Sequence, residues 1–140
     1  MRVANRFSIA VHILLLLAAS DGENASSEWM AGSIGVNPVI VRRTMTMLRE
    51  AGLVNTQKGV AGASIAKSLD QINLLDVFKA VESEESVFSV HQNPNPNCPV
   101  GAKIQTTLEK VYGNAQTAME KELEQVTLNK LTKDLFTATA

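Results

Sequence analysis

Apolar residues recur at helical spacing along most of the chain and predict its elements in order. The first twenty residues, MRVANRFSIAVHILLLLAAS, hold an apolar run that predicts a buried first helix. The turn-forming residues DGEN follow, and Ser26 or Ser27 is expected to cap a short helix that ends at Ile34, before Gly35. The apolar side of that short helix is expected to hold Trp29, Met30 and Ile34.

Asn37 and Pro38 mark the start of the next helix, because asparagine is a favoured N-cap and proline is favoured at the first helical position. This helix is expected to run to about Ala51, with Gly52 ending it. Its buried stripe, at i, i+4 and i+7, is formed by Val41, Met45 and Leu48. Two helices joined by the short turn GVN predict a helix-turn-helix.

Two short β-prone stretches follow. The first begins at Leu53 and Val54, and the second ends at Ile65 and Ala66. Lys58, two glycines and small residues between them are typical of a flexible hairpin tip. A β-hairpin directly after a helix-turn-helix is interpreted as a wing.

The remainder of the chain predicts a helix capped by Asn73, a long helix from Pro99 onward and a last short helix from Thr127. The long helix has one apolar stripe, which must be covered either by the same helix of a second subunit or by the chain's own first helix. We favour the homodimer. The expected dimerisation residues are Ile104, Leu108, Val111, Ala115, Met119 and Leu123.

Together these elements predict a mainly α fold with a small β-hairpin wing, that is, a winged helix-turn-helix followed by a long C-terminal dimerisation helix. We expect a DNA-binding region in residues 1–72. Residues 73–140 are expected to form a linker helix, a cysteine-containing loop and the dimerisation helix.

The first twenty residues also resemble a secretory signal, because arginines precede an apolar run and small residues. Ser8 and His12 interrupt that run, which is shorter than the ~20 apolar residues that a membrane-spanning helix needs. The chain has a single cysteine, which excludes an intrachain disulfide and fits a reducing cytosol. We therefore expect a cytoplasmic protein with a buried first helix and no membrane partner.

Charge is distributed unevenly along the chain. From Val36 to Lys67 there are five basic residues and one acid, whereas Ser68 to Ala140 holds ten acids and six lysines. The net charge of −1 therefore conceals a basic region that could face phosphates.

The start of the second helix of the helix-turn-helix is the expected DNA-reading surface, because an α-helix fits the major groove, where base edges differ. Arginine can pair with guanine, and valine or isoleucine can contact a thymine methyl. A lysine at the wing tip is more suited to a phosphate. The expected contacts to double-stranded DNA are Asn37, Val39, Ile40, Arg42, Arg43, Thr46 and Lys58.

The sequence does not predict an enzyme. It has no Walker loop and no His-x-x-x-His zinc pattern. His91 and Cys98 lie seven residues apart in an expected loop, without an orienting group for a catalytic dyad. We expect no catalytic residue, no metal site and no cofactor.

Several segments carry a resemblance when their order and spacing are taken together: GV…VRRTMTMLREAGLVNTQKGVAG, INLLDVFKAVE, CPVG…IQTTLEKV and TLNKL. From Met1 to about Leu131 the chain resembles the Rrf-two (Rrf2) family of bacterial regulators. That family includes the iron–sulfur biogenesis regulator, the nitric-oxide-sensing repressor and the cysteine-metabolism repressor. The resemblance implies transcriptional control by a homodimeric winged helix with a long C-terminal dimerisation helix.

The chain departs from that family at its contact positions. The wing reads KGVAGAS where the family usually has Arg-Gly-Pro-x-Gly-Gly-Tyr, and residues 40–43 replace a Tyr-Leu-Glu-Gln-like run. The operator sequence is therefore not implied. Cluster-binding members carry three cysteines before the long helix, whereas this chain has Cys98 alone. Iron–sulfur clusters generally need four protein ligands, mostly thiolates, so no cluster is expected.

Cys98 precedes Pro99 and is expected at or near the N-cap of the long helix. Helix N-termini stabilise thiolates, which favours the hypothesis of a redox sensor. The alternative is an inert cysteine packed against the core.

These patterns predict a homodimeric transcription factor, expected to be a repressor at a pseudo-palindromic operator, with a small molecule or an oxidant as effector. The alternative is a winged-helix module that contacts proteins in a regulatory complex without reading DNA. Salt dependence distinguishes the two, because phosphate contacts release counterions.

Overall fold

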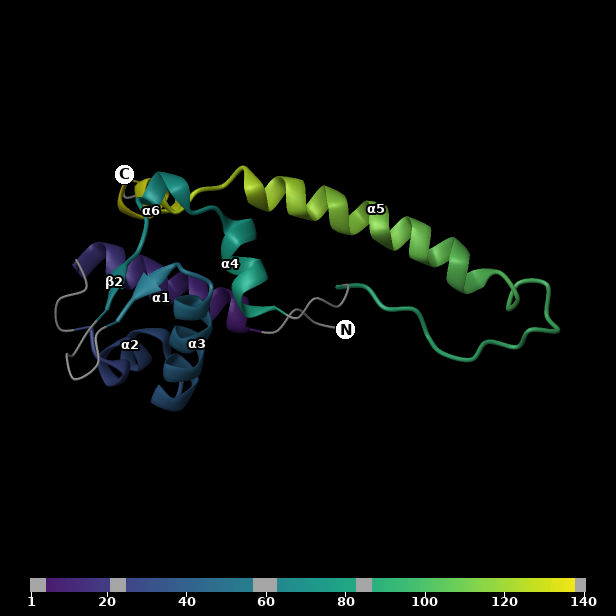
Figure 1. Ribbon diagram of the computed structural model, residues 1–140, viewed down its shortest axis with the longest axis horizontal. Coiled ribbons are helices and arrows are strands. Elements are labelled where there is room, and N and C mark those ends of the chain that lie inside the picture. The colour runs from purple at the N-terminus through teal and green to yellow at the C-terminus, as the bar shows by residue number, and fades with distance from the viewer. Residues whose placement is uncertain (1–4, 21–24, 57–62, 83–86, 138–140) are drawn as a thin grey trace.

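The computed structural model describes residues 5–20, 25–56, 63–82 and 87–137, which form mostly helices around one two-stranded hairpin (Figure 1). The predicted mainly α architecture with a small hairpin is confirmed. In chain order the elements are α1 (Arg6–Ser20), α2 (Ser27–Ile34), α3 (Pro38–Glu50), β1 (Val54–Asn55), β2 (Ser64–Ile65), the 3-10 helix η1 (Leu69–Gln71), α4 (Leu74–Val81), α5 (Ile104–Glu124) and α6 (Leu128–Thr137).

The first helix, α1, is the centre of the packed body. It contacts α2, α3, α4, α6 and β2. A helix with neighbours on several sides has little surface for charged side chains, which explains its nearly continuous apolar run. The predicted buried first helix is confirmed, and no described helix is long and apolar enough to cross a membrane. The buried residues of α1 are Ile9, Ala10, Ile13, Leu14 and Leu17.

Caps define the two helices that follow. The Ser26 Oγ accepts a hydrogen bond from the Trp29 backbone N–H at 3.0 Å, as expected for an N-cap. The turn begins at Gly35, whose φ of 84° lies in the left-handed region that favours glycine. At the start of α3, the Asn37 Oδ1 accepts from the Val39 N–H at 2.9 Å. These local bonds fix the turn between α2 and α3.

Trp29 differs from its prediction. We expected it on the apolar side of α2, but its side chain is 47% exposed, whereas Met30 beside it is buried. The helix is short and amphipathic, so one side is enough to cover the core, and Trp29 lies on the other.

The buried side of α3 also differs in one position. Val41 and Leu48 are fully buried as predicted, but Met45 is only half-buried and Thr44 is buried beside them. A buried threonine is tolerated because its Oγ1 donates to the Ile40 carbonyl oxygen at 2.8 Å.

The two strands pair antiparallel, with Val54 opposite Ile65 and Asn55 opposite Ser64. β1 contacts α3, and β2 contacts α1, so the hairpin is held against the helix-turn-helix. Its tip, with Lys58, lies outside the described residues.

After α4 the chain leaves the body, and we call residues 87–126 the arm. An extended loop leads to the distal end of the arm, and α5 returns toward the body (Figure 1). α5 contacts α4 and has no buried residue. In Figure 1 it extends away from the body instead of folding back along α1.

Two backbone hydrogen bonds anchor the return of the arm. The Leu74 N–H donates to the Val126 carbonyl at 2.8 Å, and the Leu128 N–H donates to the Ile72 carbonyl at 2.9 Å. Ile72 and Leu128 are fully buried in the same cluster as the α1 side chains. The core of the body therefore includes residues from both sides of residue 72.

The long helix begins at Ile104, not at Pro99 as predicted. Before it, the Ala102 N–H donates to the Cys98 carbonyl at 2.8 Å, so this segment forms turns. Lys103 has φ −122° and ψ −8°, outside the helical range, and separates these turns from α5.

Candidate nucleic-acid interface

The exposed side of α3 brings together most of the predicted DNA contacts. Val39 is 44% exposed and Ile40 is 37% exposed, both large exposures for apolar side chains. Arg42, Arg43 and Thr46 are also exposed, and Asn37 is exposed at the helix start. The predicted residues that the structure describes thus form one surface, which combines apolar, neutral polar and cationic side chains.

Buried contacts fix the orientation of that surface. α3 packs against α1, α2 and α4, and its buried side chains Val41 and Leu48 have no solvent exposure. Because these anchors lie nearly two helical turns apart, α3 cannot roll about its axis without exposing one of them. The packing therefore determines which side of α3 is exposed.

A cleft of about 460 Å³ lies between α2, α3 and the hairpin. Arg42, Thr46 and Arg49 line it from α3, Glu28 lines it from α2, and Thr56 lines it just after β1. Cations and hydroxyl groups thus face the same space beside the exposed surface of α3. Such groups are the usual partners of DNA phosphates.

Two of the three arginines of α3 have a polar partner. The Arg42 Nη1 lies 3.4 Å from the Glu28 Oε1, and the Arg49 Nη1 donates to the Thr56 Oγ1 at 3.4 Å. Arg43 forms no ion pair with any residue that the structure describes. The three arginines therefore differ in their polar partners, which are a carboxylate for Arg42 and a hydroxyl group for Arg49.

Sequence reasoning missed Glu28. The helix dipole alone explains an acidic residue in the first turn of α2, so the sequence gives no reason to expect an ion-pair partner for Glu28. Glu28 and Arg42 belong to different helices, so no helical spacing connects them. Only the crossing of α2 and α3 brings the Glu28 carboxylate to Arg42.

Comparison with known proteins decides the family. The profile of the family Rrf2, described as "Iron-dependent Transcriptional regulator", matches residues 3–134. The chain belongs to the Rrf2 family. YwnA of Bacillus subtilis (strain 168), named as an HTH-type transcriptional regulator, is 42% identical over 134 residues, which cover 96% of this chain and 99% of YwnA. The family inferred from the sequence is thus confirmed, and these relatives are transcriptional regulators and not enzymes.

Solved structures agree with the fold of an Rrf2 protein. A crystal structure described as a transcriptional regulator from Lactobacillus plantarum has a TM-score of 0.80 at 26% identity, with 94% of this chain and 90% of that chain covered. IscR of T. potens has a TM-score of 0.73 at 20% identity, with 100% of this chain and 92% of that chain covered, and it supports the fold alone. The predicted winged-helix fold is confirmed.

The Rrf2 description names iron, but the donor set of this chain does not fit an iron–sulfur cluster. Such clusters take four ligands, mostly cysteine thiolates, and the chain has one cysteine. Among the residues that the structure describes, no group of three or more His, Cys, Asp or Glu could hold a metal ion. We assign no step to iron.

Cys98 lies in the turns that precede α5, and not at the N-cap of the helix as predicted. A backbone hydrogen bond from Gly101, and to a smaller extent one from Val100, lowers the pKa of the Cys98 thiol. The turn is tight, because a Cβ added at Gly101 would clash with the Asn95 carbonyl oxygen. The thiolate is therefore stabilised by turn amides, while the side chain is half-exposed.

The predicted dimerisation residues all lie on α5. Val111 is 54% exposed and Ala115 is exposed, and the other four are half-buried. Beside this stripe, the rings of Phe88 and Tyr112 stack at a centroid distance of 5.4 Å, which ties the loop to the helix. An apolar stripe without a buried residue is a surface that a partner could cover.

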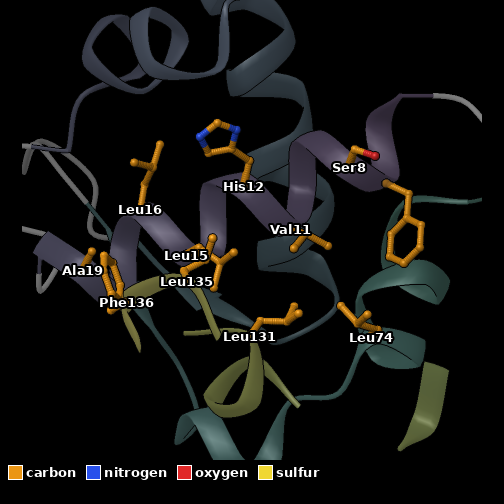
Figure 2. A pocket seen from close by; sticks show the side chains of 11 residues that line it. Ser8, Val11, His12, Leu15, Leu16, Ala19, Leu74, Leu131, Leu135 and Phe136 are labelled. Atoms are coloured by element: carbon orange, nitrogen blue, oxygen red, sulfur yellow. The ribbon is translucent and has the colours of Figure 1, made fainter. Parts of the chain in front are cut away.

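An apolar groove of about 510 Å³ lies between α1, α4 and α6. Figure 2 shows Leu131 and Leu135 of α6 beside Val11 and Leu15 of α1. The ring of His12 points away from α6, and its Nε2 lies 3.2 Å from the Ser33 Oγ. The lining includes no lysine or arginine, so this groove lacks the permanent positive charge that binds nucleic acid phosphates.

Proposed function

We propose that this Rrf2 protein is a homodimeric repressor that reads a pseudo-palindromic DNA operator with α3. The observation that carries the proposal is the exposed surface of α3, where Val39, Ile40, Arg42 and Arg43 lie on a helix fixed by its buried side. Arginine guanidinium groups suit guanine, and apolar side chains suit thymine methyl groups. The surface thus offers two kinds of base contact on one helix.

The cleft and the hairpin supply the phosphate contacts in this proposal. Arg49 joins the end of α3 to the base of the hairpin through Thr56. Lys58 at the hairpin tip is proposed to contact the DNA backbone. Phosphate contacts fix the position of a protein on the duplex, while base contacts specify the sequence.

The homodimer in this proposal rests on α5. This helix spans 21 residues, or ~30 Å at ~1.5 Å per residue, and carries its apolar stripe outside the core. Pairing two such stripes about a two-fold axis is the simplest way to cover them, and it presents two α3 helices to one duplex. Recognition helices related in this way contact half-sites about 34–36 Å apart.

Repression requires only that the dimer occupies a promoter, and in this proposal α3, the hairpin and α5 together provide the contacts for that. In this proposal the Cys98 thiolate adjusts occupancy. Hydrogen peroxide oxidises the thiolate to sulfenic acid and releases hydroxide, which places a larger polar group in the tight turn before α5. Since α5 carries the dimer surface, a change in this turn alters how the two α3 helices are spaced.

The test is selection of duplexes from a randomised 30-base-pair library, followed by gel-shift titration of the recovered sequence and a scrambled control. We expect a sequence with two inverted half-sites, and binding that weakens steeply as salt rises. The double variant Arg42→Ala, Arg43→Ala should lose the preference, whereas the matched change Lys133→Ala on α6 should retain it. Failure to enrich any sequence would overturn the proposal.

One observation favours a second candidate, a winged-helix module for protein contact. Trp29 is 47% exposed on α2, and exposed aromatic side chains are enriched at protein interfaces. This candidate predicts no sequence preference among duplexes and no steep salt dependence. Sequence-preferring binding of duplexes that weakens steeply with salt would argue against it.

A further inference from the structure

An acid lies within the surface that is proposed to face DNA. The Glu28 Oε1 is 3.4 Å from the Arg42 Nη1 across the cleft between α2 and α3. Both side chains remain accessible, with 71% and 54% exposure respectively. A carboxylate in this position repels phosphates, so it opposes DNA binding unless it has another use.

The place of Glu28 on the surface is set by helix α2. Glu28 lies in the first turn of α2, where the helix dipole favours a negative charge. Met30 and Ala31 of the same helix are buried in the core, so α2 cannot move Glu28 away from Arg42 without disturbing the packing. The backbone of Glu28 is thus fixed close to Arg42, and the two exposed side chains meet across the cleft.

The contact uses one end of the guanidinium only. The Arg42 Nη1 faces Glu28, and the remaining N–H donors of Arg42 have no hydrogen-bond partner among the described residues. A guanidinium carries five donors in a fixed fork, so Arg42 can keep the Glu28 contact and still present donors to a guanine edge. Moving the side chain to a phosphate would instead exchange the carboxylate for the phosphate.

We propose that Glu28 is a positioning residue that raises the preference of this protein for its operator over other DNA. It holds Arg42 in one orientation, which favours base contact, and it keeps Arg42 from the phosphate-only contact that non-specific complexes use. The inference rests on the proposed reading of DNA by α3. It adds to that proposal a role for Glu28 on α2, a residue that contacts no base, in the choice of operator over other DNA.

The experiment is a titration of Glu28→Gln with two duplexes, the sequence selected by the wild-type protein and a scrambled sequence of equal composition. Glutamine keeps the shape and removes the charge. We expect the variant to bind the scrambled duplex about two- to fivefold more tightly, in line with an exposed ion pair. Operator binding should stay equal or weaken. The slope of log K against log salt for the scrambled duplex should steepen by about 0.9, as for one added phosphate contact.

Two controls separate positioning from a general change in charge. Glu50→Gln removes one acid from the far end of α3, where Glu50 has no ion pair among the described residues, and it should leave the ratio of the two affinities unchanged. In an Arg42→Ala background, Glu28→Gln should no longer lower that ratio. Circular dichroism verifies that each variant is folded.

This inference is overturned if Glu28→Gln leaves the ratio of operator affinity to scrambled-duplex affinity unchanged. It is also overturned if Glu50→Gln lowers that ratio as much as Glu28→Gln does, or if Glu28→Gln lowers it equally in the Arg42→Ala background. If the wild-type protein selects no sequence, the proposed function fails and the inference fails with it. If the wild-type protein selects an operator and Glu28→Gln retains the full preference, only the role of Glu28 is rejected.

Discussion

Arg6 and Glu82 join the first turn of α1 to the end of α4 through an ion pair of 3.1 Å. The Glu82 side chain is 12% exposed and the Arg6 side chain is 44% exposed, so the carboxylate has little water and depends on its partner. The pair connects two helices that both contact α3. It is therefore a stabilising contact of the body, between α1 and the end of α4.

Removing Arg6 should destabilise the body. We expect Arg6→Ala to lower the free energy of unfolding by about 1 kcal/mol, since it leaves a half-buried carboxylate without its cation, and the partial exposure of Arg6 limits the effect. Urea unfolding followed by circular dichroism measures it. The double variant Arg6→Ala, Glu82→Gln should recover part of the loss. Additive losses would show that the two side chains are not coupled.

Asn37 has a structural use and a proposed DNA contact, and two substitutions separate them. Asn37→Ala should lower the free energy of unfolding by about 1 kcal/mol, because the Val39 N–H loses its cap. Asn37→Ser keeps a capping oxygen and should keep the stability. If Asn37 also contacts DNA, the serine variant should still lose operator affinity. Unchanged affinity in Asn37→Ser would restrict the residue to its capping role.

A charge in the stripe of α5 should separate the proposed dimer. Val111→Asp places a carboxylate on a position that is 54% exposed in the single chain, so the chain itself should tolerate it. Sedimentation equilibrium should then find monomers, with operator affinity reduced by about tenfold or more because one recognition helix acts alone. Thr117→Asp adds the same charge to the opposite side of α5 and should leave the dimer intact. A dimeric Val111→Asp protein would place the interface elsewhere.

The turn amides predict the pH dependence of Cys98. They lower the pKa of the thiol in the folded protein, so the thiolate is present at pH values where an unfolded chain is already protonated. The stabilisation by this group is present above the ordinary thiol pKa and is lost as the pH falls through the lowered value. Alkylation by iodoacetamide should accordingly continue to lower pH in the folded protein than in urea. Cys98→Ser removes the reaction and serves as the blank.

Gly101→Ala tests the cause of that shift. The added methyl clashes with the Asn95 carbonyl oxygen, so the turn must open and the amides must move away from the thiol. The pH midpoint of alkylation should rise toward that of the unfolded chain. A midpoint that does not move would mean that the amides of this turn are not what stabilises the thiolate.

Local patterns predicted the elements well, because caps and turns depend on neighbouring residues. Ser26, Asn37 and Asn73 are N-caps in the structure as expected, and Gly35 has the positive φ that its position indicated. The predicted start of α5 at Pro99 was wrong, because a proline after a residue that can act as an N-cap usually marks the start of a helix. The conformation of Lys103 that delays it has no sequence signal.

Side-chain contacts between different helices could not be predicted from the sequence. The exposed arginines of α3 could be predicted from helical spacing alone. The pairing of Arg42 with Glu28 could not, because it depends on the angle at which α2 and α3 cross. The same holds for the burial of Leu128 beside Ile72, which brings together residues on opposite sides of the arm.

That last contact has a consequence for synthesis. The N–H of Leu128 closes on the Ile72 carbonyl, and both side chains are fully buried, so the body lacks part of its interior until Leu128 has been made. A ribosome must therefore translate past Leu128 before this part of the interior can close. A chain that ended before Leu128 would leave Ile72 without this contact and expose it to solvent.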